Sequence, residues 1–355
     1  MGRRILLLIT DLEIGGTPTI VRELAMRLRA PPEVEIEVAC LKGWGPVADQ
    51  IRSAGIEVTA FGARRAWQLP PVVRRLRRLV RERGIDTVFS FLVHANAVAA
   101  LASRKLPGVR FIQSIQTTQS RPQWHWSVQR WAARRAEKIV VPSFSVFIVA
   151  TQAADVAQQR LIIIPNAIDP PQFNSEGSVP SVEATEIGFL GRLDPVKRIA
   201  DLVQAVSVLP PKFRLHIFGE GSERSKIQAE ISRLNLHGRA ILHGPVPRPQ
   251  EALNKIGQLV LPSGWEGFGL VLIEAMAASV PVVATNALGI RDVVRHEENA
   301  LVVRVGDVEA LRTAIERIAS DSALRHQLIE NGLRTVRERY SWEVVLPQYR
   351  KLLSL

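Results

Sequence analysis

The feature that most constrains the fold is a regular alternation of short apolar segments with longer helical patterns along 355 residues. Strands that alternate with helices predict parallel sheets covered by helices on both faces. The alternation runs through two halves of similar size. The predicted strands are residues 5–9, 35–40, 57–61, 87–91, 109–114 and 138–142 in the first half, and 186–190, 214–218, 240–243, 258–261, 281–285 and 300–304 in the second.

A pause in this alternation marks the predicted domain boundary. Residues 165–180 contain four prolines and one glycine among polar residues. We therefore predict an α/β chain of two Rossmann-like domains, residues 1–170 and 171–341, with an amphipathic final helix at 342–355 that packs back on the first. Open parallel sheets bind ligands beyond the carboxyl ends of their strands, so we expect the ligand in a central cleft that both sheets face.

The single cysteine and the distribution of apolar residues exclude several classes of protein. Cys40 has no partner for a disulfide within the chain, and its apolar neighbours predict a buried strand residue. No apolar stretch approaches the ~20 residues of a membrane span, and the basic N-terminus lacks the pattern of a secretory signal. The expected location is cytoplasmic, with peripheral docking on the inner face of the membrane as an alternative.

Positive charge is concentrated in the first half of the chain. The formal net charge is +12, of which residues 1–178 carry +10. Residues 71–83 place apolar side chains at helical spacing with arginines between them, and residues 121–135 combine three tryptophans with four arginines. Arginine with tryptophan suits an interface of anionic lipid headgroups. The alternative is an arginine-rich soluble surface, and no nucleic-acid-binding module is recognisable.

Residues 262–276 carry the strongest indication of chemistry. A strand ends at Leu261, a glycine-rich turn follows, and a helix-forming run begins near Gly269. Because the start of a helix attracts anions, this turn predicts a phosphate site. Glu266 and Glu274 bracket it, and each carboxylate can accept hydrogen bonds from a pair of hydroxyls. Together they suit a pyrophosphate with a sugar at one end and a ribose at the other, although either glutamate alone would be an ordinary surface residue.

Three more turns that follow predicted strands have residues suited to binding other parts of such a ligand. Arg192 and Lys197 lie between a strand and a helix, where they can neutralise a diphosphate. Gly219 permits close approach of the backbone after the next strand. Gly15 and Gly16 follow the first strand of the chain as a nest-like anion site. A basic turn or a lone pair of glycines has little specificity by itself.

In combination, these residues resemble the retaining GT-B glycosyltransferases of family 4, or glycosyl transferases group 1, over nearly the whole chain. Glu266 and Glu274 match the Glu-x7-Glu motif of that family. The Gly-Arg-Leu sequence at 191–193 with Lys197, the turn at 165–169 and the glycines at 15–16 match further family elements. The resemblance implies the GT-B fold and transfer of a hexosyl or related sugar from a nucleoside-diphosphate sugar to a lipid-linked or cell-envelope glycan.

The resemblance also implies a role for each matched residue. Arg192 and Lys197 would hold the donor diphosphate and stabilise the leaving group, and Glu274 would bind the ribose hydroxyls. The backbone near Gly219 would contact the base, and the glycine loop of the first domain would close on the donor. Glu266 would hold the transferred sugar and its phosphate together with the backbone of three neighbours, Phe268, Gly269 and Leu270.

Some residues depart from the family pattern, and these bear on the mechanism. Many members carry a histidine beside the donor sugar, where this chain has Gln116. Ala167 and Ser279 replace usual glycines, which is tolerable unless φ is positive there. No carboxylate nucleophile is recognisable in the first half, which favours a front-face route in which the departing diphosphate accepts the proton of the acceptor. No Asp-x-Asp motif lies in a suitable loop, so no tightly bound metal and no other cofactor are expected.

Two rival interpretations stay open at this point. A nucleotide-sugar 2-epimerase or a phosphorylase could use the same two-domain fold, and a non-catalytic relative could bind a nucleotide sugar without turnover. The Glu-x7-Glu segment combined with the Gly-Arg-Leu…Lys element disfavours the first. The complete set of four charged residues disfavours the second; these are Arg192, Lys197, Glu266 and Glu274.

Overall fold

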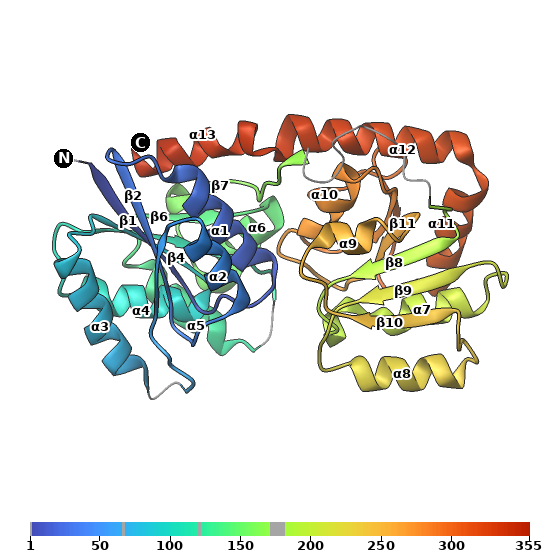
Figure 1. Cartoon of the computed structure of the whole chain (residues 1–355), viewed down its shortest axis with the longest axis horizontal. Helices are drawn as coiled ribbons and strands as arrows, with labels where there is room; N and C mark the ends of the chain where they lie inside the picture. Colours follow the sequence, from blue (N-terminus) through green and yellow to red (C-terminus); the bar gives the residue numbers. More distant parts are fainter. Residues whose placement is uncertain (1, 66–67, 120–121, 171–181) are drawn as a thin grey trace. The chain divides into compact units, whose positions relative to one another are not determined.

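The computed structural model describes residues 2–65, 68–119, 122–170 and 182–355, and it divides into two compact units. Unit 1 comprises Met1–Asn166 and Val345–Leu355, and unit 2 comprises Ala167–Val344. Figure 1 colours the chain from blue at the N-terminus to red at the C-terminus. Of the predicted linker at 165–180, residues 171–180 lie outside the described residues. Each unit contains a parallel sheet with its own helices, so the predicted class of two Rossmann-like α/β domains is confirmed.

Unit 1 is built on a seven-stranded parallel sheet in the order β3-β2-β1-β4-β5-β6-β7. The central strands are almost continuously apolar, as expected for strands with helices on both faces, and all five residues of β4 are buried. The strands are β1 (Arg3–Ile9), β2 (Val34–Cys40), β3 (Glu57–Ala60), β4 (Thr87–Phe91), β5 (Arg110–Ser114), β6 (Lys138–Val141) and β7 (Leu161–Ile163).

The helices of unit 1 bury one apolar stripe each against this sheet or against one another. In α3, Val72 and Leu76 pack with Leu6 and Leu8 of β1, while the arginines between them point away from this core. Figure 1 shows α3 beside α4, in agreement with the contacts of the two helices. The helices are α1 (Gly16–Leu28), α2 (Pro46–Ser53), α3 (Leu69–Glu82), α4 (Val93–Ser103), α5 (Trp124–Ala133) and α6 (Phe144–Ala154).

Unit 2 has a six-stranded parallel sheet in the order β10-β9-β8-β11-β12-β13. Its strands are β8 (Glu186–Leu190), β9 (Arg214–Phe218), β10 (Ala240–Gly244), β11 (Gln258–Leu261), β12 (Val282–Thr285) and β13 (Leu301–Val303). Its helices are α7 (Ile199–Ser207), α8 (Arg224–Arg233), α9 (Pro249–Leu253), α10 (Leu270–Ala277), α11 (Val308–Ser320) and α12 (Ser322–Thr335). One continuous core includes residues from all six strands and from these helices.

The last helix, α13 (Trp342–Leu353), follows unit 2 in the chain, and its residues from Val345 onward belong to unit 1. Tyr349 is fully buried there, with its ring centroid 6.3 Å from that of Phe89 in β4. The guanidinium of Arg110 in β5 donates to the carbonyl oxygens of Leu352 and Leu353. These contacts fix the end of the chain to the sheet of unit 1.

Candidate functional site

The predicted site residues of unit 2 lie in turns at one edge of its sheet. Strands β10, β9, β8, β11 and β12 are neighbours and run parallel, so the turns that follow them all lie at their carboxyl ends. Arg192 and Lys197 follow β8, and Gly219 follows β9. The segment with Glu266 and Glu274 follows β11 and includes α10.

Glycines allow the turns after β8 and β9 to pack backbone against backbone. A Cβ atom on Gly219 would lie 1.9 Å from the carbonyl oxygen of Gly191, and the φ of Gly219 is +142°. One step further, a Cβ atom on Gly221 would lie 2.5 Å from the carbonyl oxygen of Leu193. The N–H of Leu193 donates to the carbonyl of Glu220 at 2.8 Å. The close approach that Gly219 permits is therefore to the protein's own backbone, and it accounts for this glycine without a ligand.

Lys197 and Glu266 are brought together although 69 positions separate them in the chain. The Lys197 ammonium donates to Glu266 Oε1 at 2.5 Å, and only 15% and 14% of the two side chains are exposed. The backbones hold this pair in place, because the N–H of Gly264 donates to the carbonyl of Val196 at 2.8 Å. The predicted basic turn and the predicted carboxylate turn thus form one charged centre.

Two further residues support Glu266, and sequence reasoning missed both. The buried hydroxyl of Ser263 donates to Glu266 Oε1 at 2.8 Å, and its own carbonyl accepts from Thr285 Oγ1 at 2.6 Å. Gly289, with φ at +82°, packs so closely that a Cβ atom there would lie 2.2 Å from the carbonyl oxygen of Glu266. Both residues follow strands of this sheet, and that position is the signal that could have identified them.

The start of α10 has the features expected of an anion site. Gly269 caps the helix with φ at +81°, and Leu270 is the first helical residue. Phe268 points into the core, with its ring edge-on to Tyr340 at a centroid distance of 5.4 Å, so its backbone is the part left for a ligand. Glu274 follows in the second turn and is buried. Neither Glu274 nor Glu266 is the ordinary surface carboxylate that was the alternative.

The remaining predicted residues are placed differently. Arg192 is 73% exposed and pairs with Asp194 at 3.1 Å instead of joining the Lys197–Glu266 pair. Gly15 and Gly16 are in unit 1, where Gly16 is the first residue of α1 after β1. The backbone of Gly15 is extended, with φ at 170°, so its conformation is open to any residue.

Gln116, which occupies the place of the expected histidine, lies within a polar group of unit 1. Its side-chain amide donates to Ser114 Oγ at 2.6 Å and accepts from Asn166 Nδ2 at 3.4 Å. In unit 2, Ser279 adopts a positive φ of 60° just after α10. A serine in this conformation costs about 1 kcal/mol relative to glycine. The replacement of glycine by Ser279 was expected to be tolerable only without a positive φ, and that condition is not met.

Neither a metal-binding cluster nor a membrane-spanning helix occurs among the described residues. Among them, no group of three or more His, Cys, Asp and Glu side chains is arranged to hold a metal ion. Over the same residues, no helix combines the length and the apolar character that crossing a membrane requires. The expectation that the protein binds no metal stays a prediction.

Two family models match adjoining parts of the chain. The model described as Glycosyltransferase Family 4 matches residues 14–172, and the model described as Glycosyl transferases group 1 matches residues 173–335. Together they span most of the chain, and the change from one to the other lies close to the division after Asn166.

Curated relatives include enzymes named for polysaccharide synthesis. An exopolysaccharide phosphotransferase of Streptomyces coelicolor is 36% identical over 203 residues, covering 56% of this chain and 21% of that protein. The lipopolysaccharide core biosynthesis glycosyltransferase LpsE of Rhizobium meliloti is 30% identical over 215 residues, covering 58% of this chain and 62% of LpsE. These matches therefore span less than two thirds of either relative. A glycogen synthase of Mycobacterium tuberculosis is 25% identical over 94% of this chain and 89% of its own length.

Solved structures share the fold along the whole chain. HepE of Anabaena, solved with UDP and glucose, has a TM-score of 0.88 at 20% identity over 99% of both chains. Sucrose-phosphate synthase of Thermosynechococcus elongatus has a TM-score of 0.84 at 22% identity, covering 99% of this chain and 100% of that one. With the two parallel sheets and the two family models, these likenesses show that the chain belongs to the group 1 glycosyltransferases of the GT-B fold.

Proposed function

We propose that this chain is a retaining glycosyltransferase that moves a hexosyl unit from a nucleoside-diphosphate sugar to a lipid-linked or cell-envelope glycan. The observation that carries the proposal is the largely buried Lys197–Glu266 pair in the turns after β8 and β11, with Glu274 inside α10. An ammonium, a helix start and two carboxylates provide partners for a diphosphate and for the hydroxyls on both sides of it. Membership of the family and the polysaccharide-synthesis names of its relatives support glycosyl transfer.

Lys197 has the central role in the proposed donor site. The carboxylate of Glu266 orients its ammonium, so the cation is in place before a diphosphate arrives. Arg192 can leave Asp194 for a phosphate at little cost, because an exposed ion pair is weak and a guanidinium binds phosphate with two parallel hydrogen bonds. The start of α10 would hold a phosphate, Glu266 the transferred sugar and Glu274 the ribose.

The proposed reaction is a front-face displacement at the anomeric carbon of the donor sugar. The bond from this carbon to the diphosphate oxygen breaks, and its electron pair stays with the diphosphate. A bond from the same carbon to the acceptor hydroxyl forms on the same face, and the hydroxyl proton passes to the departing diphosphate. The protein contributes by orienting the reactants and by stabilising the negative charge that grows on the leaving group, which is the role assigned to Lys197 and Arg192.

A screen of UDP- and GDP-sugars with the full chain tests the donor site. We expect one nucleotide sugar to bind and to be turned over. Lys197→Ala should then lower kcat by roughly 100-fold or more, because it removes a preorganised charge at the leaving group. Arg192→Ala should lower kcat as well. Lys212→Ala, an exposed cation before the amino end of β9, is the matched control and should keep full activity. Near-normal transfer by both Lys197→Ala and Arg192→Ala would show the leaving-group role to be wrong.

Analysis of the products separates the rival enzymes. A 2-epimerase would convert the nucleotide sugar into its epimer without consuming an acceptor, and a phosphorylase would consume inorganic phosphate. A non-catalytic relative would bind the nucleotide sugar and release no product. The anomeric proton signal of the product in NMR tests the mechanism, because an inverted configuration would refute the front-face route.

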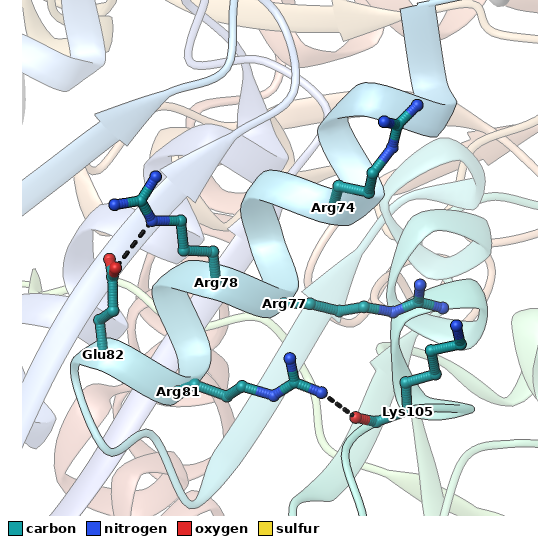
Figure 2. Close-up of a pocket in the computed structure, with 6 residues that line it drawn as sticks. All are labelled: Arg74, Arg77, Arg78, Arg81, Glu82 and Lys105. Atoms are coloured by element: carbon teal, nitrogen blue, oxygen red, sulfur yellow. Dashed lines mark hydrogen bonds and ion pairs between the residues drawn. The ribbon is translucent and has the colours of Figure 1, made fainter.

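Unit 1 supports a second part of the proposal, which is docking on an anionic membrane surface. Figure 2 shows Arg74, Arg77, Arg78 and Arg81 on α3, with Arg77 and Arg81 directed toward Lys105. These side chains line an open cavity of about 380 Å³, and Glu82 is the single acidic residue among those that line it. Arginines grouped in this way on an exposed helix face suit the phosphates of anionic lipids.

Hydrogen bonds hold part of this basic surface in place. Arg77 donates to the carbonyls of Leu101 and Ala102 at the end of α4, and Arg81 donates to the carbonyl of Lys105 at 2.9 Å. The guanidinium groups are therefore oriented before a headgroup binds, which lowers the entropy cost of binding.

Co-sedimentation with vesicles of phosphatidylglycerol and phosphatidylcholine at physiological salt tests the docking. The triple variant Arg74→Ser, Arg78→Ser and Arg81→Ser should lower the partition onto phosphatidylglycerol vesicles by roughly 100-fold, since each cation near the surface adds to the attraction. A control variant removes as many positive charges from exposed sites of unit 2, and it should keep the binding. Its substituted residues are Lys226, Arg233 and Arg248. Absence of pelleting by the unmodified chain would remove the membrane proposal.

A further inference from the structure

Unit 1 gathers polar and aromatic side chains at the carboxyl ends of four strands that are neighbours in the order β2-β1-β4-β5. Lys42 follows β2 and Asp11 follows β1, and Lys42 Nζ lies 3.0 Å from Asp11 Oδ2. His94 lies in the first turn of α4 after β4, and Trp124 begins α5 after β5. Ligands of parallel sheets bind at this edge, and none of these residues has a part in the proposed donor site.

Three rings form the centre of this group. The ring centroids of Trp124 and His125 are 3.9 Å apart, and His94 lies 6.0 Å from Trp124 and 5.8 Å from His125. The indole of Trp124 is 52% exposed. Two residues along the same helix, Trp126 is buried and donates its indole N–H to the carbonyl of Gln119 at 2.7 Å. Trp124 is therefore an exposed apolar surface beside polar imidazoles, whereas Trp126 packs in the interior of unit 1.

A buried network of polar side chains fixes the two helices that carry these rings. Asn96 of α4 donates to Gln129 Oε1 of α5 at 2.9 Å and to the carbonyl of Ser114 at 3.0 Å, and it accepts from Ser90 Oγ at 2.8 Å. Buried networks of this kind rigidify the elements that they join. The His94 and Trp124 ends of α4 and α5 are consequently held relative to each other and to β4 and β5.

The backbone before His94 is strained, which is common where a side chain is positioned for a ligand. Leu92, between β4 and α4, has φ at 73° and ψ at 153°, a conformation that only glycine adopts easily. It persists because the buried side chain of Asn96 and the fully buried strand β4 hold both sides of the turn.

The two imidazoles are suited to hydrogen bonding in the neutral form. Desolvation lowers the pKa of both His94 and His125 from the ordinary value, and the charges of His125 and Lys42 lower the pKa of His94 further while Asp11 raises it. A neutral imidazole has one donor and one acceptor nitrogen, which can serve a sugar hydroxyl as acceptor and donor. The ion pair of Lys42 and Asp11 adds further polar atoms beside them.

We propose that this aromatic group is the subsite for the acceptor sugar, with a pyranose ring stacked on Trp124 and its hydroxyls hydrogen-bonded by His94 and His125. The C–H face of a pyranose carries partial positive charge and matches the negative face of an indole. Polar groups around an apolar surface then fix the orientation of the ring. This inference rests on the proposed glycosyl transfer, and it assigns the acceptor to a hexopyranose and not to a bare lipid.

The test compares Trp124→Ala and Trp124→Phe with Trp131→Ala in the full chain. Trp131 lies two turns further along α5, with Arg104 Cζ 5.7 Å from the centroid of its ring. It is a control of the same residue type in the same helix. Saturation-transfer difference NMR with methyl hexopyranosides measures binding without turnover. A steady-state assay with the best of these sugars as acceptor measures its KM and the hydrolysis of the donor.

We expect Trp124→Ala to remove the saturation-transfer signals of the pyranose ring and to raise the acceptor KM at least tenfold, with donor hydrolysis unchanged. Trp124→Phe should be intermediate because it keeps a smaller ring, and Trp131→Ala should match the unmodified protein. Equal sugar binding and equal acceptor KM in Trp124→Ala and Trp131→Ala would overturn the proposal. A protein that binds hexopyranosides through Trp124 but turns over no nucleotide sugar would keep the subsite and refute the transferase.

Discussion

Replacing Gly289 by alanine should displace Glu266 without altering the chemistry of its side chain. The added Cβ atom would lie 2.2 Å from the carbonyl oxygen of Glu266 and 2.7 Å from its carbonyl carbon, whereas ordinary contact begins at 3.4 Å. The two turns must therefore separate by about 1 Å, because backbone atoms cannot interpenetrate. A misplacement of that size near the reacting groups lowers turnover roughly 100-fold.

Gly238→Ala separates this collision from the cost of the backbone conformation. Gly238 has φ at +77°, close to the +82° of Gly289, and nothing lies within 4 Å of a Cβ atom built on it. It lies in an exposed turn before β10, at the amino edge of the same sheet. Alanine in the left-handed conformation costs about 1 kcal/mol at either position. Gly289→Ala should lose about 2 kcal/mol more, the typical cost of overpacking.

Three measurements check this prediction. Calorimetric unfolding reports the stability of each variant, and hydrogen exchange over residues 258–276 reports whether the Glu266 turn has loosened. Turnover of the nucleotide sugar found in the screen reports the position of Glu266. If Gly289→Ala matches Gly238→Ala in stability, in exchange and in turnover, the turn after β12 does not hold Glu266 in place.

Three further predictions concern single contacts. Lys197→Met should destabilise unit 2 by about 3 kcal/mol, because it leaves a largely buried carboxylate without this cation. A double-mutant cycle with Glu266→Gln, measured by urea unfolding, should give a coupling energy of at least about 1 kcal/mol between the two residues. The absence of coupling would contradict the pair. Burial raises the pKa of the Cys40 thiol from the ordinary 9.0 to about 11. Iodoacetamide at pH 8 should therefore modify it about 100-fold more slowly than a thiol of ordinary pKa, and labelling at the ordinary rate would be contrary evidence. Tyr349→Phe should raise the stability of unit 1 by about 1 kcal/mol, because the buried hydroxyl has no hydrogen-bond partner among the described residues; a loss of stability on thermal unfolding would point to such a partner.

The strands were predictable from the sequence because parallel strands with both faces covered are continuous apolar runs. Every predicted strand exists, and the bounds differ by at most two residues, as at Arg3 and Arg4, which are charged but pair with β2. The strand that was missed, β7, has three residues at the edge of its sheet, which is too short for a pattern to appear. The start of helix α1 at Gly16 was not predictable, since glycines give no helical signal.

The site was predictable in its residue types but not in its contacts. The sequence placed Lys197 and Glu266 in turns after strands, while the sheet order that makes β8 and β11 neighbours decides that they meet. The glycine at position 219 was interpreted as making room for a ligand, whereas the structure explains it by the close approach of the Gly191 backbone. The contact of His94 with Trp124 was not predictable, because it depends on the adjacency of β4 and β5, which spacing along the chain does not show.

The interlocked turns of unit 2 limit how donor preference can be re-engineered. Because the turn after β9 fits against the turn after β8, and the turn after β12 fits against the turn after β11, a loop grafted alone from a relative would meet backbone that it was not shaped for. Chimeras should therefore exchange these turns in pairs, with crossover points in helices such as α7 and α8, away from the carboxyl edge. Natural divergence in the choice of sugar is under the same restriction, so side-chain changes that leave the backbones of these turns in place are the easier route.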